Sequence, residues 1–519
     1  MVNAAAEIDA GTSRVNRIVV GLAVFYFLLE WIPSILGDYG YFIDEFYYLA
    51  CADHLSFGYV DHPPLSVFLL WLVRGILGDS LLAIRFVPAL AGGATVLLVG
   101  RIARHLGADS LGQVLAAGAM VIGAVYQVTF SNYSMNALSV LMWAVGFYVL
   151  VRIEQENRQN WWPVLGIVVG LGLLNKHTFI LFPVGLCVGM LLTPARRHLA
   201  SGWLWGGCLI AACLLLPNLI WQMTNGYPSL EFYRNAELYK NVPTPPLEVI
   251  FYQILAVNPG TLVVWVSGLV FLLFSKSARS LRHLGWIYIA LLVLMVVSQN
   301  SRPDRIAGAY IILFAAGGTL LSALCRRRTW RWLRWAIPSV FVLTGLALVP
   351  LALPILPVNL MADYAATLGV VPQIEKSEGG RPQVPLWMAH RIGWEQFVDD
   401  IEAVAEELDQ DELPRAVILV PTYGQAGAIE LLGRGKHLPP VYASQNNYYH
   451  WGPPPDSADI AVVTGFSERT IRWLFAECES VRTYNCDWCT PWRDNAPIWI
   501  ARHPNLPLKE AWPELRFYE

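Results

Sequence analysis

Two adjacent carboxylates, Asp44 and Glu45, follow the first long apolar stretch of the chain and open a segment rich in aromatic residues. Neighbouring side chains on a helix point about 100° apart, so these two cannot act together on one atom. We expect one of them to enter a polar cavity, where a carboxylate can serve as a general base, and the other to pack or to form a pair. The two acids also fit a structural interpretation, because acidic residues in the first turn stabilise the dipole of a helix.

A second motif, Asp-His-Pro-Pro-Leu at residues 61–65, is predicted to start a helix that lies along the membrane surface and carries proline in its first turn. The free N–H groups at the start of a helix bind phosphate, and His62 would lie beside them. We therefore include His62, and Tyr59 shortly before it, among the candidate substrate-binding residues. The His-Pro-Pro sequence also fits an ordinary turn.

Further polar residues lie at the ends of later apolar stretches. The distribution of Lys and Arg among the loops predicts that these ends face the outside of the cell. These polar residues are Asn136, Lys176, Arg302 and Arg305. Ionisable groups near membrane depth are costly, and they tend to mark an aqueous cavity or the charge of a ligand. Each residue alone also fits a solvated loop. Together with the two carboxylates, they predict that an anionic headgroup is held at the membrane surface.

A sugar attached to polyprenyl phosphate would suit these residues. Its phosphate is already a good leaving group, so cations or helix N-termini can stabilise its departure without a general acid. The hydroxyl group that accepts the sugar must still lose a proton, and one carboxylate on the opposite face of the sugar can take it. Asp44 and the basic residues supply both requirements, and no nucleotide-sugar site is needed.

The composition indicates a polytopic membrane protein. Only 14% of the 519 residues are charged, 55% are hydrophobic, and the mean hydropathy is +0.45. An ordinary soluble protein has about 25% charged residues. These values exclude a disordered chain, a basic nucleic-acid-binding protein and a small secreted domain held by disulfides.

Eleven stretches are long and apolar enough to be predicted as membrane-spanning helices. They cover residues 17–36, 81–105, 111–130, 135–153, 161–174, 178–192, 203–222, 250–274, 284–298, 306–324 and 333–355. Residues 63–79 form a further apolar stretch that carries Arg74 and Asp79, so we expect an interfacial helix there.

Lys and Arg are enriched in alternate loops, which predicts that those loops are cytoplasmic. The N-terminus is then cytoplasmic, the first stretch stays uncleaved as a span, and residues 37–80 lie outside. Residues 1–358 hold 23 Lys and Arg against 16 Asp and Glu, a net charge of +7, whereas residues 359–519 hold 13 against 23, a net charge of −10. We predict a membrane module at 1–358 and an extracytoplasmic domain at 359–519.

The C-terminal part is predicted to be a small α/β domain. Helices are expected at residues 395–408, 426–432 and 468–478, and strands at residues 416–421, 460–465 and 498–501. This alternation favours a parallel sheet. The glycine-containing segment at residues 423–427 follows a strand, but it lacks the third glycine and the acidic partner of a dinucleotide-binding motif. We interpret it as an ordinary tight turn.

Cys486 and Cys489 lie three positions apart in the part expected outside, where an oxidising compartment permits a disulfide. Free thiols and a metal site are the alternatives, although a zinc site would need two further ligands. We predict no required cofactor. A divalent metal is compatible with the sequence, but no motif indicates one.

Four motifs stand out in the membrane portion: DEFYY at residues 44–48, DHPPL at 61–65, SMNAL at 134–138 and GLLNK at 172–176. As a set, they resemble bacterial members of the protein O-mannosyltransferase-like family, glycosyltransferase family 39. This family belongs to the GT-C superfamily, which also includes lipid A aminoarabinose transferase. Segments at residues 423–427, 446–448 and 451–454 extend the similarity into the tail of one bacterial subgroup.

The resemblance implies a mainly helical GT-C fold and an inverting transferase of the bacterial cytoplasmic membrane. The donor would be a polyprenyl-phosphate sugar, and the acceptor a hydroxyl group of a lipid, glycan or protein. By the same resemblance Asp44 is the base, with Glu45 beside it, and His62 stands where a relative uses lysine to contact the donor phosphate. Because histidine carries less charge, the basic residues named above would take over that contact. Relatives carry an acid near the start of the fourth span, where this chain has Asn136.

Two other functional classes were weighed against a transferase. A transporter or flippase for a lipid-linked sugar should show internal repeats and polar residues at mid-membrane. We find no such repeat, and the polar groups gather at one face. A noncatalytic scaffold would bind polyprenyl phosphate no better than any anionic lipid. Membrane lipids are expected partners in each case, and nucleic acid is not.

Overall fold

The computed structural model describes residues 16–37, 39–299, 302–369, 380 and 382–519, which divide into two compact units. The first unit comprises Met1–Leu36, Arg85–Leu219 and Pro243–Ile355, and the second Gly37–Ile84, Ile220–Val242 and Leu356–Glu519. The second unit therefore groups the C-terminal part with the predicted first outer loop. Residues 1–15 of the predicted membrane module, and residues 370–379 and 381 of the predicted outer domain, lie outside the described residues. The division at residue 358 stays a prediction.

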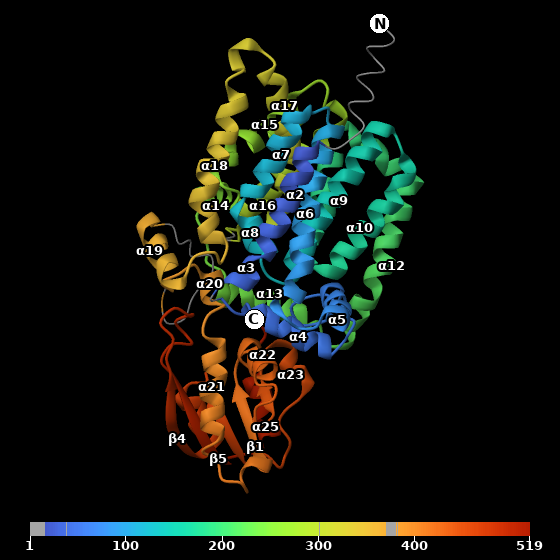
Figure 1. Ribbon diagram of the computed structural model, residues 1–519. Coiled ribbons are helices and arrows are strands. Elements are labelled where there is room, and N and C mark those ends of the chain that lie inside the picture. The colour runs from blue at the N-terminus through green and yellow to red at the C-terminus, as the bar shows by residue number, and fades with distance from the viewer. Residues whose placement is uncertain (1–15, 38, 300–301, 370–379, 381) are drawn as a thin grey trace. The chain divides into compact units, whose positions relative to one another are not determined.

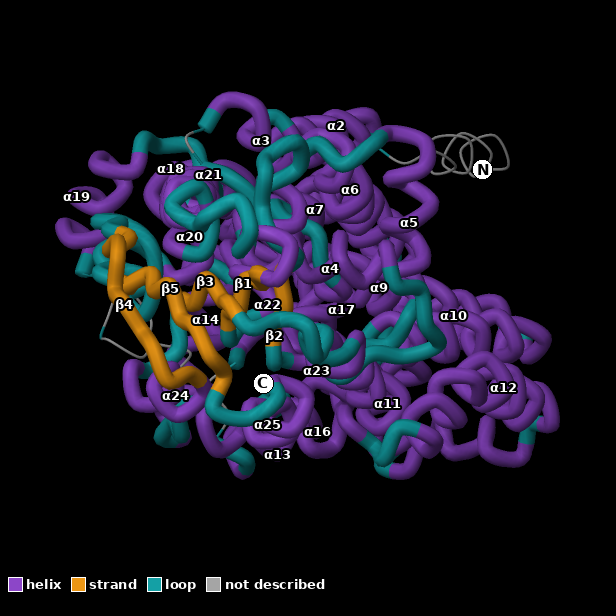
Figure 2. Tube along the Cα trace, turned by 90° about the horizontal axis from the view of Figure 1, so that it is seen from below, coloured by secondary structure: helices purple, strands orange, loops and turns teal. Residues whose placement is uncertain are grey.

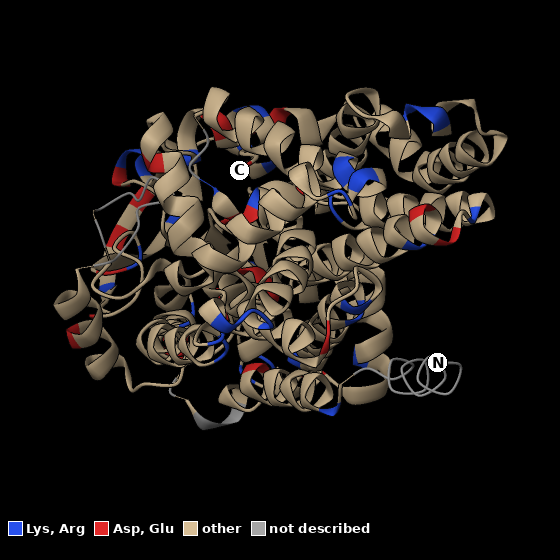
Figure 3. Ribbon diagram, turned by 90° about the horizontal axis from the view of Figure 1, so that it is seen from above, with Lys and Arg blue, Asp and Glu red and all other residues tan. Residues whose placement is uncertain are grey.

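The first unit is helical (Figure 1). Its helices are α2 (Arg17–Trp31), α3 (Pro33–Leu36), α6 (Leu81–His105), α7 (Ser110–Ile122), α8 (Ala124–Phe130), α9 (Met135–Glu156), α10 (Trp162–Asn175), α11 (Leu181–Leu191), α12 (Gly202–Thr224), α14 (Pro246–Ala256), α15 (Leu262–Phe274), α16 (Arg282–Val297), α17 (Tyr310–Cys325) and α18 (Leu333–Ala352). Charged residues are sparse along these helices, which Figure 3 shows as mostly tan ribbon. An apolar composition of this kind fits helices surrounded by lipid.

Six helices among the described residues are long and apolar enough to cross a membrane, or up to nine if each of three bent helix pairs forms one span. Length and composition thus support fewer spans than the eleven predicted. The predicted span at 111–130 is broken, because α7 and α8 bend by 64° at Gly123. The predicted span at 250–274 is also broken, because α14 and α15 bend by 89° near Asn258, whose φ is 72°. Helices α10 and α11 are separate, as predicted, and adjoin the turn at Lys176.

Helix α17 lies in the core of the first unit, and most of its residues are buried. Two glycines, Gly268 on α15 and Gly317 on α17, let the backbones of these two helices lie in close contact. A Cβ on Gly317 would lie 1.9 Å from the Val264 carbonyl oxygen, and a Cβ on Gly268 would lie 1.9 Å from that of Leu313. Small residues of this kind let the backbones of membrane helices approach closely, where dispersion contacts hold them together.

The second unit contains a five-stranded sheet and several short helices (Figure 2). The strands are β1 (Ala416–Val420), β2 (Val441–Ala443), β3 (Ile460–Thr464), β4 (Phe475–Tyr484) and β5 (Ala496–Pro504). The helices are α4 (Ile43–Asp53), α5 (Leu65–Leu77), α13 (Pro228–Asn235), α19 (Val358–Leu368), α20 (Leu386–Ala389), α21 (Trp394–Ala405), α22 (Tyr423–Leu432), α23 (Asn446–Trp451), α24 (Glu468–Leu474) and α25 (Leu508–Leu515).

The sheet order is β2-β1-β3-β5-β4. β1 pairs in parallel with β2 and β3, with Ile418 opposite Val441 and Val462, whereas β5 is antiparallel to both β3 and β4. The predicted α/β domain with strands at β1, β3 and β5 is confirmed. The prediction of a parallel sheet is wrong for the half that contains β4 and β5, because a strand directly follows α24 instead of a returning helix.

Two of the sequence predictions for this unit are wrong at particular segments. The helix predicted at 468–478 ends at Leu474, and the chain continues as β4. β4 lies at the edge of the sheet, where exposed charged side chains are tolerated, so its polar sequence did not indicate a strand. The segment at 423–427 is the start of helix α22 and not a tight turn.

Replacement of Gly317 by alanine is expected to destabilise the protein. The added Cβ would overlap the Val264 carbonyl, and overpacking of this kind costs about 1 to 3 kcal/mol. Thermal unfolding of the detergent-solubilised protein should report the loss. Gly206→Ala on α12 is the matched control, since nothing lies within 4 Å of a Cβ there. Equal melting temperatures for the two variants would contradict the close packing of α15 and α17.

Candidate active site

Helix α4 carries the two adjacent carboxylates at its start, and they have different environments. Glu45 is fully buried, and its Oε2 accepts a hydrogen bond of 2.8 Å from the backbone N–H of Phe42. This contact caps the first turn of the helix, where N–H groups have no partner within the helix. Asp44, on the neighbouring face, is only half-buried. Glu45 thus has a structural task, while Asp44 is the more accessible of the two.

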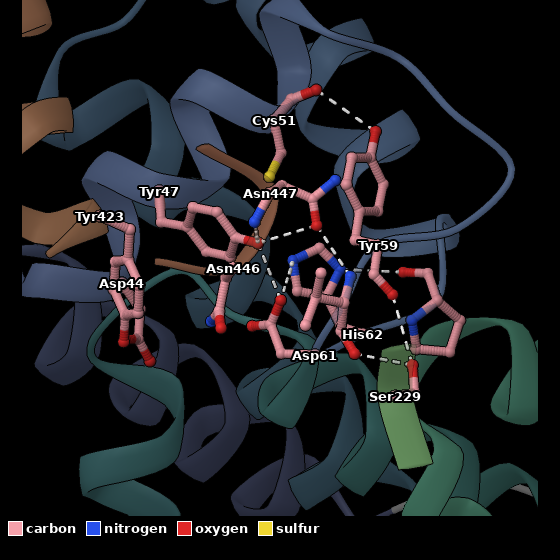
Figure 4. Close-up of polar contacts among 12 residues, drawn as sticks. Asp44, Tyr47, Cys51, Tyr59, Asp61, His62, Ser229, Tyr423, Asn446 and Asn447 are labelled. Carbon is pink, nitrogen blue, oxygen red and sulfur yellow. Dashed lines mark hydrogen bonds and ion pairs between the residues drawn. The ribbon is translucent and has the colours of Figure 1, made fainter. Parts of the chain in front are cut away.

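Asp44 meets a tyrosine from a distant part of the sequence. The hydroxyl group of Tyr423 donates a hydrogen bond of 3.0 Å to Asp44 Oδ1 (Figure 4). Tyr423 is the first residue of α22, and its ring stacks on that of Tyr47, one turn after Asp44 on α4, with ring centroids 4.6 Å apart. The carboxylate is therefore held by a donor that comes from the C-terminal part of the chain.

Tyr47 belongs to a second set of contacts that fixes the loop after α4 (Figure 4). Its hydroxyl group donates to Asp61 Oδ1 at 2.9 Å and accepts a hydrogen bond of 3.3 Å from the Asn447 backbone N–H. Asn447 also accepts, through Oδ1, a hydrogen bond of 2.7 Å from the Val60 backbone N–H. These contacts bind residues 60–61 to α23 and leave Asp61 mostly shielded from solvent, with a side chain 15% exposed.

His62 is fully buried and stacks on Tyr48, with ring centroids 4.6 Å apart and planes tilted by 11°. Its Nδ1 lies 3.1 Å from the Pro63 carbonyl oxygen, and its Nε2 is 3.9 Å from Asp61. The two prolines were expected in the first turn of the next helix. That expectation is wrong, because α5 begins at Leu65, after both of them. A phosphate contact by His62 stays a prediction.

Tyr59 is buried within the same loop. Its hydroxyl group accepts a hydrogen bond of 3.1 Å from the Ser56 backbone N–H and lies 3.2 Å from the His54 carbonyl oxygen. Tyr59 thus closes the turn that follows α4, and its predicted role in substrate binding stays untested. The interfacial stretch predicted at 63–79 is the helix α5, whose Arg74 forms ion pairs with Asp53 and Asp79.

The arginine partners of Asp79 hold its carboxyl group in the charged form. Burial opposes ionisation of its carboxyl group, but hydrogen bonds from Arg74 and Arg434 outweigh that effect and hold the pKa of Asp79 below its ordinary value. Asp79 is therefore a charged structural partner for the end of α5.

The remaining predicted residues come together in the first unit. Lys176 Nζ donates a hydrogen bond of 2.6 Å to Asn136 Oδ1 and lies 3.8 Å from Asp304 Oδ2. Arg302 Nε donates to Asp304 Oδ1 at 3.2 Å. Asn136, Lys176, Asp304 and Arg305 line one small cavity, together with Trp143 and other residues. Residues from three separate parts of the sequence thus form one cluster.

Local structure places two members of this cluster, Asn136 and Lys176. Ser134 caps α9, and its Oγ accepts a hydrogen bond from the Asn136 backbone N–H. Asn175 at the end of α10 donates a hydrogen bond of 2.7 Å to the Met135 carbonyl, which ties the two helix ends together and brings Lys176 to Asn136. Because asparagine is neutral, it orients the ammonium group without cancelling its charge.

Three cations and one carboxylate make this cluster net positive. Lys176, Arg302 and Arg305 carry three positive charges, and Asp304 carries one negative charge. Arginine can bind phosphate oxygens in a bidentate manner, and lysine acts as a point charge. The charges of the cluster are therefore suited to attract an anion such as phosphate.

Cys486 and Cys489 are free thiols in the structure, and both are buried. Cys489 Sγ lies 3.2 Å from the Cys486 carbonyl oxygen. A hydrogen bond from Cys489 and the nearby charge of Arg493 lower the pKa of the Cys486 thiol. Among the described residues no group of three His, Cys, Asp or Glu side chains could hold a metal ion.

Sequence reasoning missed Tyr47, Tyr423 and Asn447. Tyr47 and Asn447 lie within motifs that carried the family resemblance, but nothing in the sequence showed that those motifs meet. The signal for Tyr423 is the pair of glycines that follows it, Gly424 and Gly427, which allow α22 to pack closely on α4.

The family model described as dolichyl-phosphate-mannose-protein mannosyltransferase (PMT_2) matches residues 61–221. Lipid A galacturonosyltransferase RgtD of Rhizobium johnstonii is 24% identical over 188 residues, which is 35% of this chain and 38% of that protein. Lipopolysaccharide core galacturonosyltransferase RgtB of the same organism is 22% identical over 334 residues, or 63% of each chain. The match thus spans less than two thirds of either relative.

Two crystal structures of ArnT from Cupriavidus metallidurans share the fold. The apo structure superposes with a TM-score of 0.61 and 13% identity, covering 96% of this chain and 99% of ArnT. The structure bound to undecaprenyl phosphate gives a TM-score of 0.59 and 14% identity, covering 94% and 98%. The fold is therefore the predicted GT-C architecture, with a small C-terminal sheet domain. These matches do not favour the transporter alternative.

The difference between the two carboxylates can be tested by stability. Glu45→Ala removes the cap and leaves the partly buried Phe42 N–H without that acceptor, at a cost of about 1 to 3 kcal/mol. Asp44→Ala, at a half-buried position, should cost less. Thermal unfolding of the two solubilised variants measures the difference. A larger loss for Asp44→Ala would show that Glu45 is not the capping residue.

Proposed function

We propose that this chain, whose fold matches that of ArnT, is an inverting glycosyltransferase that uses a sugar linked to polyprenyl phosphate. The acceptor is a hydroxyl group of a lipid, glycan or protein at the outer face of the bacterial cytoplasmic membrane. The fold match to ArnT, one structure of which is bound to undecaprenyl phosphate, supports the donor class. The relatives RgtD and RgtB, named for lipid A and lipopolysaccharide core, support an envelope glycolipid as acceptor.

The observation that carries the proposal is the net positive cluster in a small cavity of a GT-C fold. Lys176 and Arg305 line that cavity, and Arg302 orients Asp304. In the proposed reaction these cations hold the phosphate of the donor and stabilise the negative charge that grows on it as the bond to the sugar breaks. A phosphate monoester leaves without protonation, so no general acid is required.

Asp44 is the proposed base. It takes the proton of the acceptor hydroxyl as the oxygen attacks the anomeric carbon from the face opposite the phosphate. One new C–O bond forms, the bond between the sugar and phosphate breaks, and polyprenyl phosphate leaves with the electron pair. A single displacement inverts the anomeric configuration. Glu45 cannot share this task while it caps α4.

The donor class can be tested directly with purified full-length protein. Polyprenyl phosphates that carry galacturonic acid, aminoarabinose, mannose or galactose are incubated with an envelope lipid extract, and release of polyprenyl phosphate is followed. Release from at least one donor is expected, with transfer of the sugar to a hydroxyl group. No release from any donor would contradict the proposed function.

Asp44→Asn is expected to lower kcat by about 100- to 10,000-fold, because an amide cannot accept the proton. Asp456→Asn is the matched control, since Asp456 is an exposed carboxylate of the same unit. Turnover is measured with the donor found in the panel. Near-wild-type turnover by Asp44→Asn would remove Asp44 from the mechanism.

Lys176→Met is expected to raise the KM for the donor by about 10- to 100-fold, because a charged hydrogen bond to phosphate is lost. Lys276→Met, at an exposed position outside the cavity, should leave KM unchanged. Steady-state kinetics with varied donor concentration separates the two. An unchanged KM in Lys176→Met would mean that this cluster does not hold the donor phosphate.

A further inference from the structure

A hydrogen bond joins the hydroxyl group of Tyr423 to the carboxylate of Asp44. Their oxygen atoms lie 3.0 Å apart, and the two residues are 379 positions apart in the sequence but within one compact unit. Both side chains are half-buried. A hydrogen bond between a neutral donor and a carboxylate is stronger and more directional than one between two neutral groups.

Local contacts at the start of α22 fix the position of Tyr423 beside Asp44. The helix follows β1 directly, and the Thr422 hydroxyl caps it by accepting a hydrogen bond from the Gln425 backbone N–H. The Tyr423 backbone N–H donates to Gln445 Oε1 at 3.0 Å. The position of the Tyr423 Cα is thus fixed by a helix cap and by a neighbouring side chain.

Two glycines let α22 lie directly on α4. A Cβ on Gly424 would lie 2.3 Å from Ile43 Cγ1, and a Cβ on Gly427 would lie 2.8 Å from Phe46 Cβ. Any larger residue would force the helices apart. Ile43 and Phe46 flank Asp44 in the sequence of α4, so α22 packs against α4 next to the residue that carries the carboxylate.

The ring of Tyr423 is also held in place. It stacks on Tyr47, whose own hydroxyl group is fixed by Asp61 and by the Asn447 backbone N–H (Figure 4). A phenylalanine at position 423 would keep this stacking and lose only the O–H group. The role of the hydroxyl can therefore be separated from the role of the ring.

We propose that Tyr423 is a positioning residue for Asp44, so that the C-terminal α/β part of the chain contributes to the transfer step itself. The inference rests on the proposed function of Asp44. The hydrogen bond to Oδ1 fixes the rotation of the carboxylate and hence the direction in which Oδ2 faces. A base that is fixed in advance loses less entropy when the acceptor hydroxyl arrives.

The test is Tyr423→Phe in the full-length protein, assayed with the donor and acceptor that the wild type uses. Loss of one charged hydrogen bond predicts a fall in kcat of about 10- to 100-fold. The KM for the donor should stay unchanged, and the thermal unfolding temperature should fall only slightly, because the stacked ring remains. A purely structural role would instead lower the unfolding temperature and leave the kcat of the folded fraction unchanged.

Tyr442→Phe is the matched control. Tyr442 is a half-buried tyrosine on β2, and its hydroxyl group has no hydrogen-bond partner within the described part of the chain. Its kcat should equal that of the wild type. If Asp44→Asn is inactive and Tyr423→Phe turns over normally, the positioning role is refuted while the proposed function stands. If Asp44→Asn itself turns over normally, Asp44 is not the base and the proposed function fails at this residue.

Discussion

The candidate phosphate site depends on one electrostatic interaction. Among apolar helices, a cluster of cations is attracted to a single carboxylate. Removing charge from water costs several kcal/mol for each ion unless an opposite charge or hydrogen bonds compensate. Asp304 balances one of the positive charges of Lys176, Arg302 and Arg305. An arriving phosphate adds the negative charge that this arrangement lacks, so a cluster that is costly alone becomes a binding site for an anion.

The neutral side chain of Asn136 is part of the same balance. It accepts a hydrogen bond from Lys176 and fixes the direction of the ammonium group. An acid at this position, as the family resemblance leads one to expect, would cancel a further positive charge. The chain therefore combines two departures from the family pattern, a histidine at position 62 and an asparagine at position 136.

Much of the architecture could be predicted from the sequence, because apolar length and charge asymmetry follow directly from the cost of exposing backbone to lipid. The bends at Gly123 and Asn258 could not, since they depend on how neighbouring helices pack. The grouping of Asn136, Lys176 and Arg302 was predicted from their shared place at helix ends. The contact between Asp44 and Tyr423 was not, because side-chain meetings across 379 residues leave no local pattern.

The distance along the sequence between α4 and α22 also bears on the order of events during synthesis. At about 5 to 20 residues per second, a ribosome adds Tyr423 roughly 20 to 75 s after Asp44. Throughout that interval the nascent helix α4 has its own cap from Glu45, so it can form early. Asp44, however, does not yet have its hydrogen bond from Tyr423. A chain released before α22 is translated would carry Asp44 without the hydrogen bond from Tyr423.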